Sequence, residues 1–173
     1  MKHFSRKIFF VFAALLFLQG CQHDDLCPAT TQTTSLLVIR FYDVNDRESA
    51  QAPINLSVKA VNKDTAYLTR INKDSIAIPL RTDENKTQYE FTLNAPAAGQ
   101  PSENQSIPTN TDVMSFNYGR EQVYLNRACS YKVNYVDLKV SVDEGEDGGW
   151  IKDFVIEKTN IEDESSAHIN IYY

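Results

Sequence analysis

The sequence predicts an all-β domain, an antiparallel β-sandwich of the immunoglobulin or prealbumin type with eight or nine strands. Short segments in which apolar and polar residues alternate recur from residue 35 onward, as strands with one buried face require. Pieces rich in Gly, Pro, Asn, Asp and Ser separate these segments, and no segment has the apolar period of an amphipathic helix. A parallel α/β sheet needs helices between its strands, so the pattern favours antiparallel pairing.

Nine segments carry this strand pattern. The expected strands are 35–42, 55–61, 75–80, 87–93, 112–118, 122–125, 131–142, 153–157 and 167–173. The first is apolar on both faces, which is typical of a central strand. Pro79 cannot donate a ladder hydrogen bond, so its strand is expected at a sheet edge. The apolar residues change phase between Tyr135 and Val136, which predicts a β-bulge there.

The first twenty residues have the features of a secretory signal peptide. Three basic residues precede an uninterrupted apolar run, residues 8–18. As a helix this run covers about 16 Å, roughly half of a bilayer core, so it is too short to span a membrane. It ends in Leu18-Gln19-Gly20-Cys21, which resembles the lipobox of bacterial lipoproteins. In that class the cysteine receives diacylglycerol and a peptidase cuts before it; the alternative is an ordinary signal peptide with a chance cysteine.

This interpretation divides the chain into a signal peptide (1–20), a lipidated polar tether (21–34) and a single sandwich domain (35–173). Two or three acyl chains on Cys21 would hold the domain at a membrane without a transmembrane helix. The acidic residues just after Cys21 resemble the export signal of Bacteroidota lipoproteins destined for the cell surface. A tether that faces the periplasm is the alternative. The expected location is therefore the outer membrane, with the domain on either face.

Charge limits the partners of the domain. Three of the 17 basic residues lie in the first twenty positions, so 14 remain against 23 acidic ones, a net charge of −9. Nucleic-acid binding needs Lys and Arg to displace counterions from phosphates, so no nucleic-acid partner is expected. The expected partners are the membrane, through the lipid on Cys21, and a protein or a glycan.

Two further cysteines, Cys27 and Cys129, remain when Cys21 carries lipid. An even pair in an oxidising compartment predicts a disulfide, although two buried free thiols are the alternative. The bridge would close a loop of about 100 residues, which stabilises the fold by about 4.7 kcal/mol in the chain-entropy model. A catalytic role for Cys129 is not expected, because no His lies near it in sequence to activate the thiol.

The chain also resembles an uncharacterised family of Bacteroidota lipoproteins along nearly its whole length. The shared elements are the lipobox, Asp25-Leu26-Cys27-Pro28, Leu37-Val38-Ile39-Arg40-Phe41-Tyr42-Asp43, Ala128-Cys129-Ser130-Tyr131-Lys132, Trp150-Ile151 and Ala167-His168-Ile169-Asn170-Ile171-Tyr172-Tyr173. The two cysteines of this pattern are the expected disulfide pair. The resemblance implies the compartment and the fold, and it brings no assigned activity.

No catalytic, metal or cofactor site is expected. A Ser-His-Asp triad would need His168, which is expected on the exposed face of its strand, and no Ser lies in a nucleophile-elbow sequence. Two His in the mature part, without Cys/His spacing, do not make a zinc site. The acidic loop 142–150, and a second acidic turn at residues 43–48, could bind calcium, but a solvated turn is the simpler interpretation.

Three side chains are candidates for glycan chemistry. Trp150 follows two glycines; exposed, it could stack on a sugar, but burial beside Phe154 at the end of the sandwich is favoured. Thr65 and Ser75 each lie in a match to the three-residue acceptor motif of the Bacteroidota O-glycosylation system. The expected function is therefore a non-enzymatic envelope protein that binds a partner or serves as an accessory subunit. A carbohydrate-binding lipoprotein is the first alternative and a hydrolase the second.

Overall fold

The computed structural model describes residues 26–100, 107–145 and 148–173. The expected signal peptide and Cys21 lie outside these ranges. The described residues form two compact units: residues 26–31 with 124–130, and residues 32–123 with 131–173. Within the described ranges, no helix has the length and apolarity that crossing a membrane would require.

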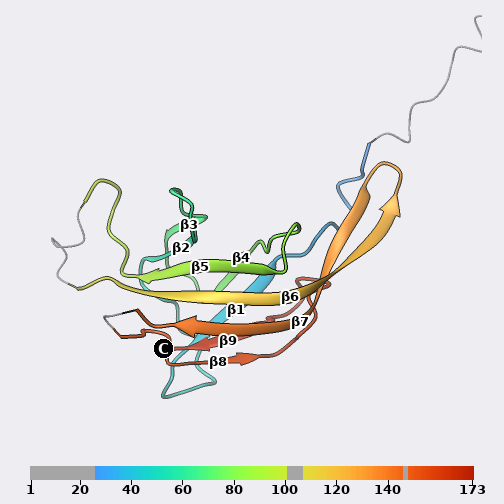
Figure 1. Cartoon of the computed structure of the whole chain (residues 1–173). Coiled ribbons are helices and arrows are strands. Elements are labelled where there is room, and N and C mark those ends of the chain that lie inside the picture. Colours follow the sequence, from blue (N-terminus) through green and yellow to red (C-terminus); the bar gives the residue numbers. More distant parts are fainter. Residues whose placement is uncertain (1–25, 101–106, 146–147) are drawn as a thin grey trace, which may run out of the picture. The chain divides into compact units, whose positions relative to one another are not determined.

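The larger unit is built from two β-sheets, which confirms the predicted all-β sandwich (Figure 1). The four-stranded sheet has the order β4-β1-β9-β8 and the five-stranded sheet the order β3-β2-β5-β6-β7. The strands are β1 (Leu37–Tyr42), β2 (Leu56–Ala60), β3 (Leu68–Ile71), β4 (Ser75–Ile78), β5 (Lys86–Leu93), β6 (Asn110–Asn126), β7 (Ser130–Asp143), β8 (Asp153–Ile156) and β9 (Ile169–Tyr172). β1 and β9 pair in parallel, whereas the pairs β1–β4, β2–β3, β2–β5, β5–β6 and β8–β9 are antiparallel.

The core lies between the two sheets. In β1 the side chains of Leu37, Ile39 and Phe41 are fully buried, while the residues between them face outward. This strand has neighbours on both sides, β4 and β9, as its two apolar faces predicted. Burial of each such side chain contributes about 1.5–3 kcal/mol. The core therefore holds β1 at the centre of the smaller sheet.

Two strand predictions need correction. The segments 112–118 and 122–125 are one continuous strand, β6, because Gly119 and Arg120 keep an extended backbone between them. Strand β3 was not expected, since its four residues include Arg70 and offer too short an alternation. Its backbone is also irregular: Arg70 has a φ of 48° and the β2–β3 register shifts.

The position of Pro79 and the phase change in β7 have the expected consequences. β4 ends just before Pro79 and lies at the edge of its sheet. In β7 the side chains of Val133 and Tyr135 are buried, and the next buried residue is Leu138 rather than residue 137. Asp137 has a φ of 54°, which places the extra residue of the bulge beside it.

The outer edge of β7 is covered by residues of the same chain. Tyr135 and Ile161 exchange two backbone hydrogen bonds, and the amide of Leu138 donates to the carbonyl of Thr159 at 2.9 Å. The amide of Val133 donates to Thr34 Oγ1 at 2.9 Å. Gln32 Nε2 also donates to a backbone carbonyl of this unit, that of Glu162. Residues 32–34, predicted to belong to the tether, therefore belong to the larger unit.

The smaller unit contains the predicted disulfide. Cys27 and Cys129 are bonded across a sequence separation of 102 residues. The amide of Cys129 donates to Asn126 Oδ1 at 2.7 Å and the amide of Thr31 donates to the carbonyl of Pro28 at 2.9 Å. These bonds close a turn on each side of the bridge, between the end of β6 and the start of β7 and in the segment 26–31.

Gly119 of β6 lies against Val136 of β7, next to the bulge. A Cβ atom added at Gly119 would lie 2.8 Å from Val136 Cγ2. Gly119→Ala is therefore expected to lower the free energy of unfolding by about 1–3 kcal/mol, the usual cost of overpacking. Urea titrations of the single variants and of Gly119→Ala with Val136→Ala would measure the coupling. The double variant should be less destabilised than the sum of the two single changes, and simple additivity would contradict the proposed clash.

Candidate functional site

Trp150 is a core residue and not a sugar platform. Its side chain is 5% exposed, and its indole Nε1 donates to the carbonyl of Phe91 at 2.9 Å. The ring stacks on Phe41, with centroids 6.4 Å apart, and meets Tyr173 edge to face at 5.4 Å. The glycan contact considered for Trp150 is therefore wrong, and burial, the favoured alternative, is what the structure shows, with Phe41 and Tyr173 as its ring partners. Ring burial and a satisfied N–H are the usual state of a core Trp.

His168 is fully buried, which corrects the expectation of an exposed side chain. Its Nδ1 accepts a hydrogen bond from the amide of Val38 at 2.9 Å, and its own amide donates to the Val38 carbonyl at 2.9 Å. Burial lowers the pKa of His168, and the nearby backbone carbonyl of Asp163 opposes this shift only in part. The imidazole is therefore neutral, and its Nδ1 is occupied by backbone. Among the described residues no Ser hydroxyl donates to it, so the structure gives no support to the triad that a hydrolase would need.

The lowered pKa of His168 predicts a loss of stability in mild acid. An unfolded His has a pKa of about 6.5, so below that pH the unfolded chain binds a proton that the folded chain resists. The free energy of unfolding should be fully present above pH 6.5 and fall as the pH drops below it. Urea titrations at pH 7.5 and 5.5 would measure the loss. His168→Asn keeps an acceptor for Val38 and should flatten this dependence; an equal slope in the variant would contradict the assignment.

The two candidate acceptors for O-linked sugar differ in exposure. Thr65 is exposed in the irregular segment between β2 and β3. Ser75 is half-buried at the first residue of β4, where it pairs with Arg40 of β1. A glycosyltransferase needs an accessible hydroxyl, so Thr65 is the better placed of the two.

The acidic turns give no metal cluster among the described residues. Residues 146 and 147 of the acidic loop 142–150 lie outside the described ranges. In the other turn, Asp43 Oδ1 accepts from the amide of Asn45 at 2.7 Å. That carboxylate stabilises the turn itself, as Asp side chains commonly do.

A groove of about 620 Å³ lies on the outer face of the four-stranded sheet. Its floor is formed by the outward residues of β1 and β9, and residues 164–167 form one wall. The groove is lined by Val38, Arg40, Tyr42, Ser75, Glu157, Lys158, Glu164, Ser165, Ser166, Ala167 and Asn170. The sequence offered one signal for it: Arg40 interrupts an otherwise apolar segment. The wall could not be foreseen, because nothing in the sequence shows that residues 164–167 border this face.

The groove combines hydrogen-bond donors and acceptors. The Arg40 guanidinium has no ion pair with any described residue and lies 5.7 Å from the centroid of the Tyr42 ring. Asn170 Nδ2 donates to Glu157 Oε1 at 2.8 Å. Asn170 Oδ1 is buried without a hydrogen bond from a described residue. The groove thus offers a cation without an ion pair, an amide oxygen without a donor, and carboxylates and hydroxyls near an aromatic ring. Such groups can bind a small ligand that carries several hydroxyl groups.

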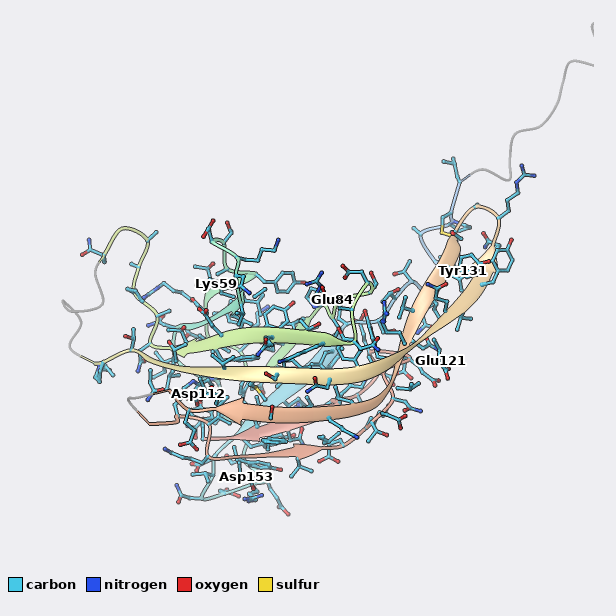
Figure 2. The ribbon with its side chains drawn as sticks, viewed as in Figure 1. Lys59, Glu84, Asp112, Glu121, Tyr131 and Asp153 are labelled. Carbon is cyan, nitrogen blue, oxygen red and sulfur yellow. A yellow bond between two sulfur atoms is a disulfide. The ribbon has the colours of Figure 1, made fainter. Side chains whose placement is uncertain are left out.

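Beside the groove, on the same face of the sheet, Arg47 and Asp153 form an ion pair. Arg47 Nη2 lies 2.6 Å from Asp153 Oδ2, and the guanidinium covers the Tyr172 ring at 4.3 Å from its centroid. The hydrogen bond from Arg47 lowers the pKa of Asp153, the labelled residue at the start of β8 (Figure 2). Arg47 is thus engaged by a carboxylate, whereas Arg40 is available to a ligand.

A second hollow, of about 380 Å³, lies beside β5 and includes Lys63, Arg81 and Lys86. Arg81 Nη2 lies 2.7 Å from Asp83 and 3.0 Å from Glu84, so two carboxylates neutralise it. The hydrogen bond from Arg81 lowers the pKa of Asp83. The lining of this hollow shares no residue with that of the groove, so it serves as a control region.

Residues 55–173 match the model of one protein family, described as a family of unknown function (DUF6452). The matched range covers β2 to β9 and therefore most of the sandwich, whereas β1, which supplies Val38, Arg40 and Tyr42 to the groove, lies outside it. No curated protein matches the chain significantly, and no solved structure does.

Proposed function

We propose that this chain, which belongs to the DUF6452 family of unknown function, is a lipid-anchored envelope protein with a non-enzymatic β-domain. In this proposal a signal peptide directs export, Cys21 carries the lipid, and the sandwich acts as a binding or accessory module. The acidic residues after Cys21, which resemble the export signal of Bacteroidota lipoproteins, support a location at the outer membrane, on either face.

The observation that carries this proposal is the disulfide. The disulfide joins Cys27 to Cys129. Of the three cysteines in the sequence, only Cys21, which ends the lipobox-like segment, lies outside the disulfide. Structural disulfides persist in oxidising compartments, so the bridge supports export. The pairing also separates the roles of the cysteines: two stabilise the fold, and Cys21 remains for the lipid.

Metabolic labelling with palmitate tests the anchor. The wild-type protein should incorporate labelled palmitate and fractionate with membranes, whereas Cys21→Ala should lose the label and keep its uncut signal peptide. Cys129→Ser is the matched control, because it removes the disulfide and leaves Cys21; it should retain the label. An unlabelled wild-type protein, or a labelled Cys21→Ala variant, would refute the anchor.

The non-enzymatic role is supported by the state of the groups that catalysis would need. His168 is buried and bonded to backbone through Nδ1. Cys27 and Cys129 are oxidised to each other, so neither can act as a thiolate nucleophile. The open groove beside Arg40 offers instead a surface for reversible binding.

A carbohydrate ligand is the second candidate, and the groove favours it over the buried Trp150. Sugars are bound by planar polar side chains that accept and donate at once, and by aromatic faces. Arg40, Asn170 and Glu157 supply the polar groups, and Tyr42 supplies the ring. The groove is small enough for one or two sugar units rather than a long chain.

A glycan array probed with the detergent-solubilised full-length protein tests this candidate. Arg40→Ala should abolish the strongest signals, because it removes the uncommitted donor from the floor of the groove. Lys86→Ala changes a cation beside the second hollow and should leave the signals unchanged. An array without signals, or equal loss in the two variants, would count against a sugar in the groove.

A further inference from the structure

We infer that the unit formed by residues 26–31 and 124–130, here called the disulfide tip, is a membrane-contact surface that rests on lipid headgroups beside the anchor. This inference rests on the proposed lipidation of Cys21. It adds to the proposed anchor, because lipidation alone does not require any folded part of the chain to contact the bilayer. The argument uses the length of the tether, the disulfide and the composition of the tip.

The tether is too short to carry the tip far from the membrane. Cys21 and Cys27 are six residues apart, and six fully extended residues span at most about 22 Å. The disulfide then joins Cys27 to Cys129, with their Cα atoms 4.7 Å apart. A lipidated cysteine lies at the membrane surface, so both segments of the tip are held within a short distance of the headgroups.

The exposed side chains of the tip suit an interface with lipid. Leu26 is 83% exposed and Tyr124 is 58% exposed, the first a large apolar side chain and the second a ring with a polar end. Tyrosine is enriched where membrane meets water, because one end of its side chain is apolar and the other wet. Insertion of Leu26 among lipid chains would remove its apolar surface from water, which lowers the free energy.

The charge of the tip differs from that of the chain around it. Arg127 is exposed and is the one charged residue among 26–31 and 124–130. None of the 23 acidic residues of the chain lies at 26–31 or 124–130, and Asp24 and Asp25 precede Leu26 in the tether. A basic side chain near the surface is attracted by anionic headgroups, and acidic ones would be repelled. Residues 26–31 and 124–130 therefore carry one positive charge and no negative one, which favours contact with anionic headgroups.

Quenching by brominated lipid tests the contact. Full-length lipidated protein would be reconstituted into vesicles of phosphatidylethanolamine and phosphatidylglycerol with brominated acyl chains. Tyr124→Trp places an indole on the tip, and the wild-type protein supplies the constant background of the buried Trp150. The matched control is Tyr67→Trp, at a tyrosine of the larger unit that is 49% exposed. We expect at least twofold quenching of the added fluorescence for Tyr124→Trp and little change for Tyr67→Trp.

A second pair of variants separates lipid contact from mere proximity. In the Tyr124→Trp background, Leu26→Asp should reduce the quenching, since a carboxylate opposes insertion. Ile54→Asp changes another exposed apolar residue, 58% exposed in the larger unit, and should leave it unchanged. Protein that floats with the vesicles but shows equal quenching at positions 124 and 67 overturns the inference and leaves the anchor intact. Protein that does not float overturns the anchor and the inference together.

Discussion

The parallel pairing of β1 with β9 is the interaction on which the rest of the larger unit depends. It joins residue pairs such as Ile39 and Ile169, which are 130 positions apart in the chain. The two strands supply fully buried side chains to the core, so the central part of the smaller sheet is fixed by hydrophobic packing. On the opposite face the same pairing brings Arg40 beside Asn170 and creates the floor of the groove. The pairing also places His168 against Val38, which removes its side chain from solvent.

Features that depend on local chemistry could be predicted from the sequence. Pro79 lacks an amide hydrogen, so its strand had to lie at an edge. The phase change in β7 follows from the alternation of side chains and needs no knowledge of the partner strand. The pairing of Cys27 with Cys129 followed from the number of cysteines and the expected compartment. In each case one residue or one short pattern restricts the backbone, whatever the rest of the chain does.

Features that depend on distant segments could not be predicted. The alternation around His168 is that of an exposed position, but Asp163 and Glu164 lie near it and the imidazole is buried. Trp150 was correctly expected in the core, although its ring contacts are Phe41 and Tyr173, which only the β1–β9 pairing brings within reach. Strand β3 is held by its pairing with β2 rather than by its own propensity. The groove was missed for the same reason, because its lining comes from β1, β4, β9 and the segment between β8 and β9.

The place of β9 in the sheet has a consequence for biogenesis. This strand leaves the ribosome, and enters any secretion channel, after the other eight strands. The smaller sheet lacks a central member until then, so β1 and β8 have nothing to bridge them. The loop that the β1–β9 pairing closes is about 130 residues long. Closing it costs conformational entropy and is slow, so this sheet is not expected to form early in folding. The smaller sheet can therefore be completed only after β9 is available, so the order of the strands along the chain makes this sheet the later of the two to close.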